Sequence, residues 1–228
     1  MKRVAEKCFE TCHNPEQIEL IFGIDDDDTE SIEMARALQK ELAPNNIEYI
    51  VWPRNKFIFS DLINQCSKPA KGEIFNIMSD DAIHNSKDWD KIALEIFDSH
   101  SDKIILLQTS GGANASTGFP FMHRNWRDAA GYLLSPIFEG DWGDYWLRDV
   151  INGLPGDRFV YSKDIEIKHL HAEWGHMEKD ETYREHLKER QAQEALPREQ
   201  HPYHGTEGTR LKNLEIENLN NFIKNYNK

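Results

Sequence analysis

The sequence predicts an α/β protein with a mostly parallel central sheet that is flanked by helices. Along the first 110 residues, short apolar runs rich in Ile, Val and Phe alternate with segments whose apolar residues recur at helical spacing. Most of the apolar runs are continuous rather than alternating, which is typical of strands covered on both faces. A chain of 228 residues with 39% hydrophobic residues is long and apolar enough for one domain, or for one domain with an appendage.

The elements follow in order from these patterns. Residues 2–13 are expected to form a helix, and the expected strands cover 18–24, 47–52, 73–78, 103–109 and 164–171. Helices are expected between them at 31–43, 60–67 and 87–100. In the first of these, Ile32, Ala35 and Leu38 lie on one helical face.

The character of the chain changes after residue 110. Residues 109–120 read as a glycine-rich loop, and 121–150 are dense in aromatic residues. The pattern divides the chain into a main domain over 1–177 and a charged, mainly helical extension over 178–228. The extension is expected to hold helices near 180–194 and 210–226 and to supply little core.

Charge and composition exclude several classes. With 27 basic and 40 acidic residues the formal charge is −13, which repels phosphate backbones, and no basic patch offsets it. Three cysteines cannot build a disulfide framework. The charged N-terminus is unlike a signal peptide, and no apolar run approaches the ~18 residues of a membrane span. A cytoplasmic protein is therefore expected, and the charge disfavours a nucleic-acid partner without excluding one.

Two acidic turns follow predicted strands. Asp25, Asp26 and Asp28 belong to the run after the first strand, and Asp80 and Asp81 follow the third. Ligands in open α/β sheets bind beyond the carboxyl ends of strands, and Mg²⁺ or Mn²⁺ needs only one or two protein carboxylates beside substrate phosphates. The alternatives are that Asp28 caps the next helix and that the second turn is merely solvated.

Histidines gather on the last predicted strand. His169 and His171 would point to the same side of that strand, with His176 close behind, so two imidazoles could approach one metal. A zinc-dependent hydrolase built on these three histidines remains an alternative. Packed or solvated histidines are the simpler explanation.

The segment 139–146 places Asp141 and Asp144 among Trp142 and other aromatic residues. A carboxylate among aromatic rings is a candidate general base, and aromatic faces suit sugar rings. The alternative is a helix that begins at Asp141 and turns its aromatic residues to the core. P-loop, Gly-x-Gly-x-x-Gly, His-Glu-x-x-His and Gly-x-Ser-x-Gly motifs are missing from the sequence.

Taken in order, these motifs resemble the GT-A glycosyltransferases, especially the family-two-like enzymes of bacteria and phages. IELIFGIDDDDTES resembles the strand end that contacts the nucleotide base, and GEIFNIMSDDAIH resembles the acidic DxD-type element. GDWGD matches the region of the catalytic acid, and IEIKHLH matches the terminal histidine strand. The resemblance covers roughly residues 3–185 and implies a Rossmann-like sandwich that binds a nucleotide-diphosphate sugar.

The resemblance also implies roles for the acidic turns. Asp25 or Asp26 would contact the nucleotide base, Asp80 the ribose or metal, and Asp81 would be the principal ligand of Mn²⁺ or Mg²⁺. This chain has Ser79-Asp80-Asp81 in place of a strict Asp-x-Asp. The sequence also begins at the helix that follows the family's first strand, and that first strand is missing from it. That implies either a start placed too late or a shorter, inactive version that only binds nucleotide sugars.

For the second half of the motif series, the resemblance makes Asp141 or Asp144 the general base and lets His169 or His171 join the metal. The expected reaction is inverting, metal-dependent transfer of a hexosyl group to a hydroxyl of a glycan, a lipid-linked glycan or a modified nucleobase.

The acceptor is expected to meet side chains after the glycine-rich loop and beside the candidate base. These candidates are His123, Arg124, Trp126 and Trp142. A packing role for Trp126 is an equal alternative.

Overall fold

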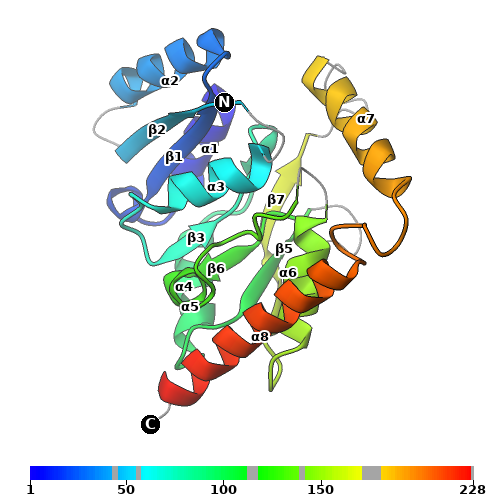
Figure 1. Ribbon diagram of the computed structural model, residues 1–228. Helices are drawn as coiled ribbons and strands as arrows, with labels where there is room; N and C mark the ends of the chain where they lie inside the picture. Colours follow the sequence, from blue (N-terminus) through cyan, green and yellow to red (C-terminus); the bar gives the residue numbers. More distant parts are fainter. Residues whose placement is uncertain (43–45, 55–57, 112–117, 139–141, 171–180, 227–228) are drawn as a thin grey trace.

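The computed structural model describes residues 1–42, 46–54, 58–111, 118–138, 142–170 and 181–226. Helices pack on both faces of β-sheets, which confirms the α/β class (Figure 1). The helices are α1 (Lys2–Thr11), α2 (Thr29–Glu41), α3 (Ile58–Ser67), α4 (Trp89–Asp98), α5 (Arg124–Ala130), α6 (Gly143–Asn152), α7 (Glu181–Glu194) and α8 (Thr206–Tyr226). The strands are β1 (Glu19–Asp25), β2 (Asn46–Trp52), β3 (Ile74–Asn76), β4 (Ala82–His84), β5 (Leu106–Ser110), β6 (Phe121–His123) and β7 (Phe159–His169).

The sheet is divided and mixed rather than single and mostly parallel, which corrects the sequence prediction in this detail. Strands β1 and β2 form a parallel pair, and the other strands form a five-stranded sheet in the order β3-β6-β5-β7-β4. Among the described strands of that sheet, only β5 and β7 run parallel, and the remaining pairs are antiparallel. Strands β4 and β6 were missed because, unlike β3, these three-residue strands do not lie within a longer apolar run that could be recognised in the sequence.

The strands of the two-stranded sheet are less covered than their continuous apolar sequences predicted. In β1 only Ile24 is buried, and in β2 only Ile47. Within the described residues β1 pairs with β2 alone. Helix α3 packs so closely against β1 that a Cβ on Gly23 would lie 3.1 Å from atoms of Leu62 and Cys66. Helices α1 and α2 supply the small core on the other face.

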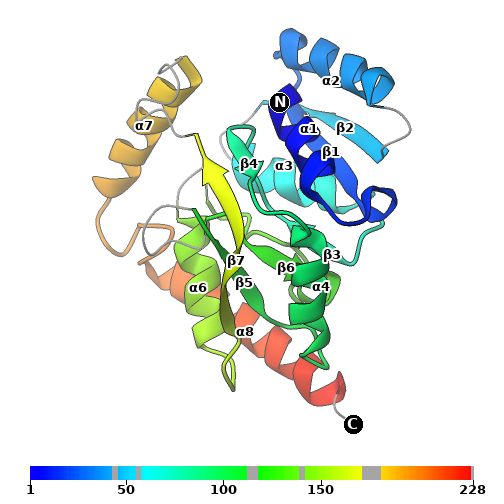
Figure 2. The same cartoon turned by 180° about the vertical axis from the view of Figure 1, so that it is seen from behind.

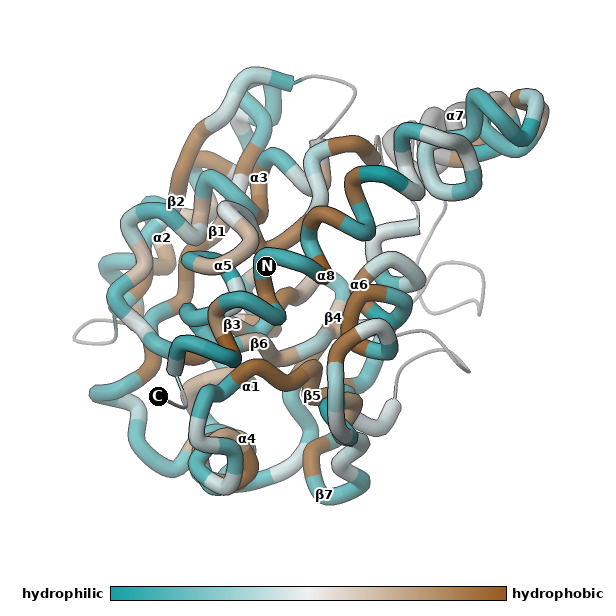
Figure 3. Tube along the Cα trace, turned by 60° about the horizontal axis from the view of Figure 1, so that its bottom comes forward, coloured by the Kyte–Doolittle hydropathy of each residue, from teal (hydrophilic) through white to brown (hydrophobic). Residues whose placement is uncertain are grey.

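The five-stranded sheet is the centre of a three-layer sandwich. Leu106 and Met122 face the layer of α5, α6 and α8, whereas Leu107 and Phe121 face α1 and α4. Neighbouring residues of one strand point to opposite faces, as a pleated strand requires. Figures 1 and 2 show these layers from opposite sides, and Figure 3 shows apolar residues along the inner strands. Strand β5 is covered on both faces, as predicted.

The C-terminal segment contributes more to the core than the sequence suggested. Leu219 and Ile223 of α8 are buried with the residues of α5 and α6, so the expectation of little core is wrong for α8. The apolar stripe of this long polar helix is narrow and easily overlooked. Helix α7 is mostly hydrophilic and projects away from the sheets (Figures 1 and 3). The predicted boundary at residues 177 and 178 lies outside the described residues.

Among the described helices, none combines the length and apolarity needed to cross a bilayer.

Candidate functional site

In the acidic turn after β1, some carboxylates have a structural role and others could contact a ligand. The Asp28 side chain accepts a hydrogen bond from the Ser31 N–H at 3.0 Å and caps α2, so the capping alternative is correct for this residue. Arg54 pairs with Asp25 at 3.0 Å and with Asp27 at 2.9 Å. The Arg54 backbone N–H also donates to Asp26 at 3.1 Å.

Arg54 changes the electrostatic interpretation of this turn. Burial raises the pKa of Asp25, the ion pair with Arg54 opposes that rise, and the neighbouring carboxylates add to it. The repulsion among the aspartates is therefore offset within the protein and does not require a ligand. One oxygen, Asp25 Oδ1, is buried without a hydrogen-bond partner among the described residues, and it can accept an N–H from a ligand.

Sequence reasoning missed Arg54, although a signal was present. Arg54 lies two residues after the end of β2, and β2 runs parallel to β1 with Trp52 opposite Asp25. The carboxyl ends of neighbouring parallel strands meet at one edge of a sheet, so the rule that selected the aspartates also applied to Arg54.

The second acidic turn meets the histidine strand. Strand β4 pairs antiparallel with β7 and sets Ala82 opposite His169. This register brings Asp81 Oδ2 to 3.1 Å from His169 Nε2, and the two side chains are 18% and 19% exposed. The Leu170 N–H donates to the Asp81 carbonyl at 2.8 Å and extends the pairing by one residue.

Two neighbours orient this Asp81–His169 pair. The Ser79 hydroxyl donates a hydrogen bond to Asp81 Oδ1. The rings of Phe119 and His169 make an edge-to-face contact with their centres 4.9 Å apart. Asp80 is exposed in the same turn. The pair offers one carboxylate oxygen and one imidazole nitrogen, a donor set that suits a hard or borderline divalent cation. Within the described ranges, no group of three or more potential metal-ligating side chains gathers. His171 and His176 lie outside those ranges.

The candidate base region surrounds the start of α6. Asp144 lies in the first turn, and one of its oxygens accepts the Tyr145 N–H at 2.8 Å. The connection from α6 to β7 is short, so α6 packs against β7 and runs in the opposite direction. Asp144 therefore lies at the end of α6 that is farther from the start of β7. Asp141 lies outside the described residues.

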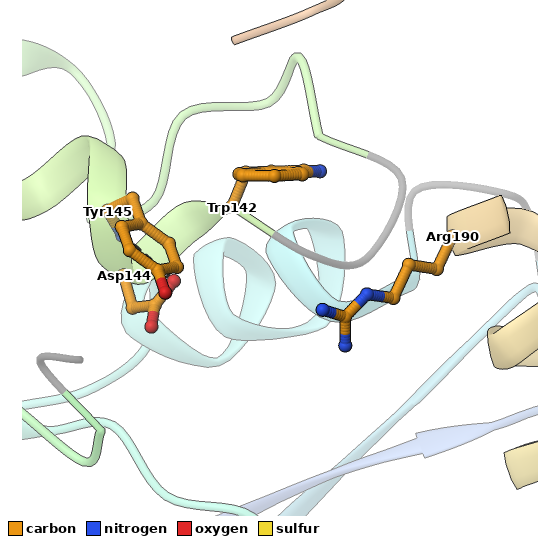
Figure 4. Close-up of a pocket in the computed structure, with 4 residues that line it drawn as sticks. All are labelled: Trp142, Asp144, Tyr145 and Arg190. Atoms are coloured by element: carbon orange, nitrogen blue, oxygen red, sulfur yellow. Dashed lines mark hydrogen bonds between the residues drawn. The ribbon is translucent and has the colours of Figure 1, made fainter. Parts of the chain in front are cut away.

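The aromatic residues of this segment differ in their exposure to solvent. Trp146 is fully buried, as the packing alternative predicted, but Tyr145 is 47% exposed. A hollow of about 230 Å³ is lined by Trp142, Asp144, Tyr145 and Arg190. Figure 4 shows Arg190 reaching toward this hollow from α7. The contribution of α7 has no sequence signal, because it depends on how the chain returns to α6.

Three of the four candidate acceptor contacts are structural, which corrects the prediction. Trp126 is fully buried in the core and cannot contact an acceptor. His123 is buried and caps α5, and burial lowers its pKa. The Arg124 guanidinium donates to the backbone carbonyls of residues 70–72. The fourth, Trp142, borders a hollow.

One family of known proteins matches most of the chain. No curated protein matches the chain by sequence. The model of the family described as glycosyl transferase family 2 matches residues 2–170 of the 228. Since that match takes in both acidic turns, the α6 segment and the histidine strand, the chain belongs to glycosyl transferase family 2, the nucleotide-sugar glycosyltransferases with a GT-A fold.

Proposed function

We propose that this protein is a metal-dependent, inverting hexosyltransferase that uses a nucleotide-diphosphate sugar. The observation that carries the proposal is the contact between Asp81 and His169 at 3.1 Å. Asp144, in the first turn of α6, is the candidate base. A cation ligand pair and a general base are the two groups that such a transfer requires.

In this proposal the donor nucleotide lies over the acidic turns. Asp25 Oδ1 accepts a hydrogen bond from the base, because it is the buried acceptor without a partner within the described chain. Asp26 lies beside it, although its Oδ1 already accepts the Arg54 N–H. Asp80, exposed in the second turn, contacts the ribose.

Asp81 Oδ2 and His169 Nε2 are the atoms that would hold Mn²⁺ or Mg²⁺. When bound, such a cation neutralises the negative charge that develops on the departing diphosphate. The hydrogen bond from Ser79 holds Asp81, and the Phe119 ring fixes the plane of the His169 imidazole. These contacts limit the motion of both side chains before any ligand arrives.

Asp144 takes the proton of the acceptor hydroxyl. The acceptor oxygen forms the new bond to the anomeric carbon, the bond from that carbon to the phosphate oxygen breaks, and the diphosphate leaves with the electron pair. Direct attack with a single base inverts the anomeric configuration. Asp141 is the competing candidate, and comparison of Asp141→Asn with Asp144→Asn assigns the base.

The acceptor hydroxyl belongs to a glycan, a lipid-linked glycan or a modified nucleobase. We place the reaction in the cytoplasm, because Cys8, Cys12 and Cys66 are free thiols, as a reducing compartment maintains them.

Thermal unfolding with UDP, GDP, ADP and CDP, each with Mn²⁺ or with EDTA, tests donor binding. A nucleotide at ~100 times its dissociation constant adds ~2.7 kcal/mol, which is several degrees in Tm at ~2–4 °C per kcal/mol. We expect one nucleotide to raise the Tm only with Mn²⁺, and we expect Asp81→Asn and His169→Ala to abolish that increase. Asp88→Asn, at an exposed carboxylate elsewhere, should leave it intact.

Turnover is tested separately with the nucleotide sugar identified in this way. Release of the nucleoside diphosphate with Mn²⁺, reduced by Asp144→Asn, is the expected result, and NMR of the product gives its anomeric configuration. Nucleotide binding without release would make this chain a binding module. The absence of any nucleotide-dependent shift would refute the donor site.

A further inference from the structure

An aromatic cluster joins the start of α6 to the C-terminal segment. The Trp142 ring stacks on Tyr203 with ring centres 5.6 Å apart and an angle of 21° between the planes. His201 and His204 meet the same indole in T-shaped contacts at 5.1 and 5.8 Å, and Tyr145 lies 5.8 Å away. We call these five residues the Trp142 cluster.

Residues of α6 and α8 hold Tyr203, the stacking partner of Trp142, in place. The Tyr203 hydroxyl donates to Asp149 at 2.6 Å, and Lys212 lies 4.1 Å from the Tyr203 ring centre while its ammonium group pairs with the same carboxylate. The following turn is tightly closed, since a Cβ on Gly208 would lie 2.0 Å from the Pro202 carbonyl oxygen. The cluster is therefore organised before any ligand binds, which lowers the entropic cost of binding.

Trp142 and Tyr203 pack against the core, but packing does not fill all the space around Trp142. The hollow of about 230 Å³ beside Asp144 meets Trp142, and so does a second hollow of about 380 Å³. The second is lined by Trp142, Glu194, Leu196, Arg198, His201 and His204. The Trp142 indole N–H makes no hydrogen bond within the described chain.

The backbone of Trp142 is also strained. Its φ is +77°, in the left-handed region that costs a bulky residue roughly 1–2 kcal/mol. Strain of this kind persists where the surrounding structure enforces it, and it concentrates at binding sites.

The chemistry around Trp142 fits one class of ligand. An aromatic surface is bordered by carboxylates from Asp144 and Glu194 and by guanidinium groups from Arg190 and Arg198. A pyranose ring has an apolar C–H face and a rim of hydroxyls that both donate and accept hydrogen bonds, so it matches both parts of this surface. A nucleobase in a DNA chain would bring phosphates toward these carboxylates and toward a protein with a formal charge of −13.

We propose that the Trp142 cluster is the acceptor subsite and that it binds a sugar ring of a glycan. The inference rests on the proposed transferase function and narrows its acceptor to carbohydrate. The ring lies against Trp142, beside the carboxylate of Asp144, and the C-terminal residues 194–204 determine which sugar is accepted. The C-terminal extension is then part of the substrate site.

Saturation-transfer NMR on the full chain tests this assignment without a known acceptor. The probes are the methyl glycosides of glucose, galactose, mannose and N-acetylglucosamine. We expect transfer to the ring C–H protons of at least one glycoside, with binding weakened about tenfold or more by Trp142→Ala. Tyr145→Ala is the second variant, because removal of a side chain that is 47% exposed leaves the fold intact. Tyr161→Ala, which removes a ring that is 59% exposed elsewhere, is the matched control and should bind as the wild type does.

The subsite would be overturned by the absence of transfer to any glycoside, or by transfer that survives both Trp142→Ala and Tyr145→Ala. Tighter binding of a single-stranded oligonucleotide that depends on Trp142 would also overturn it in favour of a nucleic-acid acceptor. The nucleotide-dependent shift in Tm is measured independently of Trp142. Glycoside binding without that shift would refute the donor site alone, and the reverse result would refute the acceptor subsite alone.

Discussion

Glu215 joins α8 to the core of the protein. It is 1% exposed, and its carboxylate accepts hydrogen bonds from Trp146 Nε1 at 2.7 Å, Tyr132 Oη at 2.9 Å and Trp126 Nε1 at 3.3 Å. All three donors are neutral, and burial raises the pKa of Glu215. A substitution here tests whether these bonds hold the C-terminal helix to the sheet.

Glu215→Ala should be severely destabilising, because it leaves three donors without their acceptor. Each buried donor left unpaired costs about 1–3 kcal/mol, and the bond at 3.3 Å is the weakest of the three. The expected loss is about 3–6 kcal/mol, a large part of the ~5–15 kcal/mol typical of a folded protein. At ~2–4 °C per kcal/mol, the Tm should fall by roughly 6–24 °C.

Urea unfolding followed by circular dichroism measures this loss. Glu217→Ala, at an exposed position of the same helix, is the matched control and should change the free energy of unfolding by less than ~0.5 kcal/mol. Trp146→Phe should cost less in the Glu215→Ala background than in the wild type, because its indole N–H has already lost its acceptor. A Glu215→Ala variant within ~1 kcal/mol of wild type would refute the reasoning.

The same carboxylate makes stability depend on pH. Because the folded-state pKa is raised above 4.5, the folded protein keeps a proton that the unfolded chain has released. Stability is therefore lost as the pH rises from 4.5 through the folded-state pKa. Glu215→Gln removes this loss, so the stability advantage of wild type over the variant should shrink from pH 5 to pH 8. A constant difference would contradict the assignment.

Three further predictions concern other sites. Arg158 and Asp102 form an ion pair with two hydrogen bonds, at 2.8 and 2.9 Å, and their side chains are only 13% and 5% exposed. Arg158→Met would leave the Asp102 carboxylate buried without its cation, so it should lower the free energy of unfolding, measured in urea, by ~3–5 kcal/mol. Burial lowers the pKa of His84 to about 3, so the free energy of unfolding should decrease as the pH falls from 6.5 toward 3. His84→Phe should make that decrease smaller, as measured by urea unfolding at pH 7 and pH 5. Arg54→Ala should raise the pKa of Asp25 further, because it removes the cation that opposes the effect of burial on that pKa. An unchanged pKa of Asp25 in a carboxyl NMR titration would show that the ion pair has no such effect.

The sequence by itself determined the class of the protein and the order of its motifs. Continuous apolar runs and helical periodicity located α1, α2, α4 and the strands β1, β2 and β5 to within a few residues. These elements depend on local hydrophobic patterns, which are long enough to be read. The acidic turns and the histidine strand were visible because charged and imidazole groups at strand ends are conspicuous in the sequence itself.

The tertiary structure decided which of these groups meet. The register between β4 and β7 selected Asp81 and His169 as neighbours, and long-range packing placed Trp126 in the core. It also brought Tyr203 to Trp142 across the domain surface. Such contacts join residues that are distant in the chain, and their energies come from burial and geometry that no local pattern encodes.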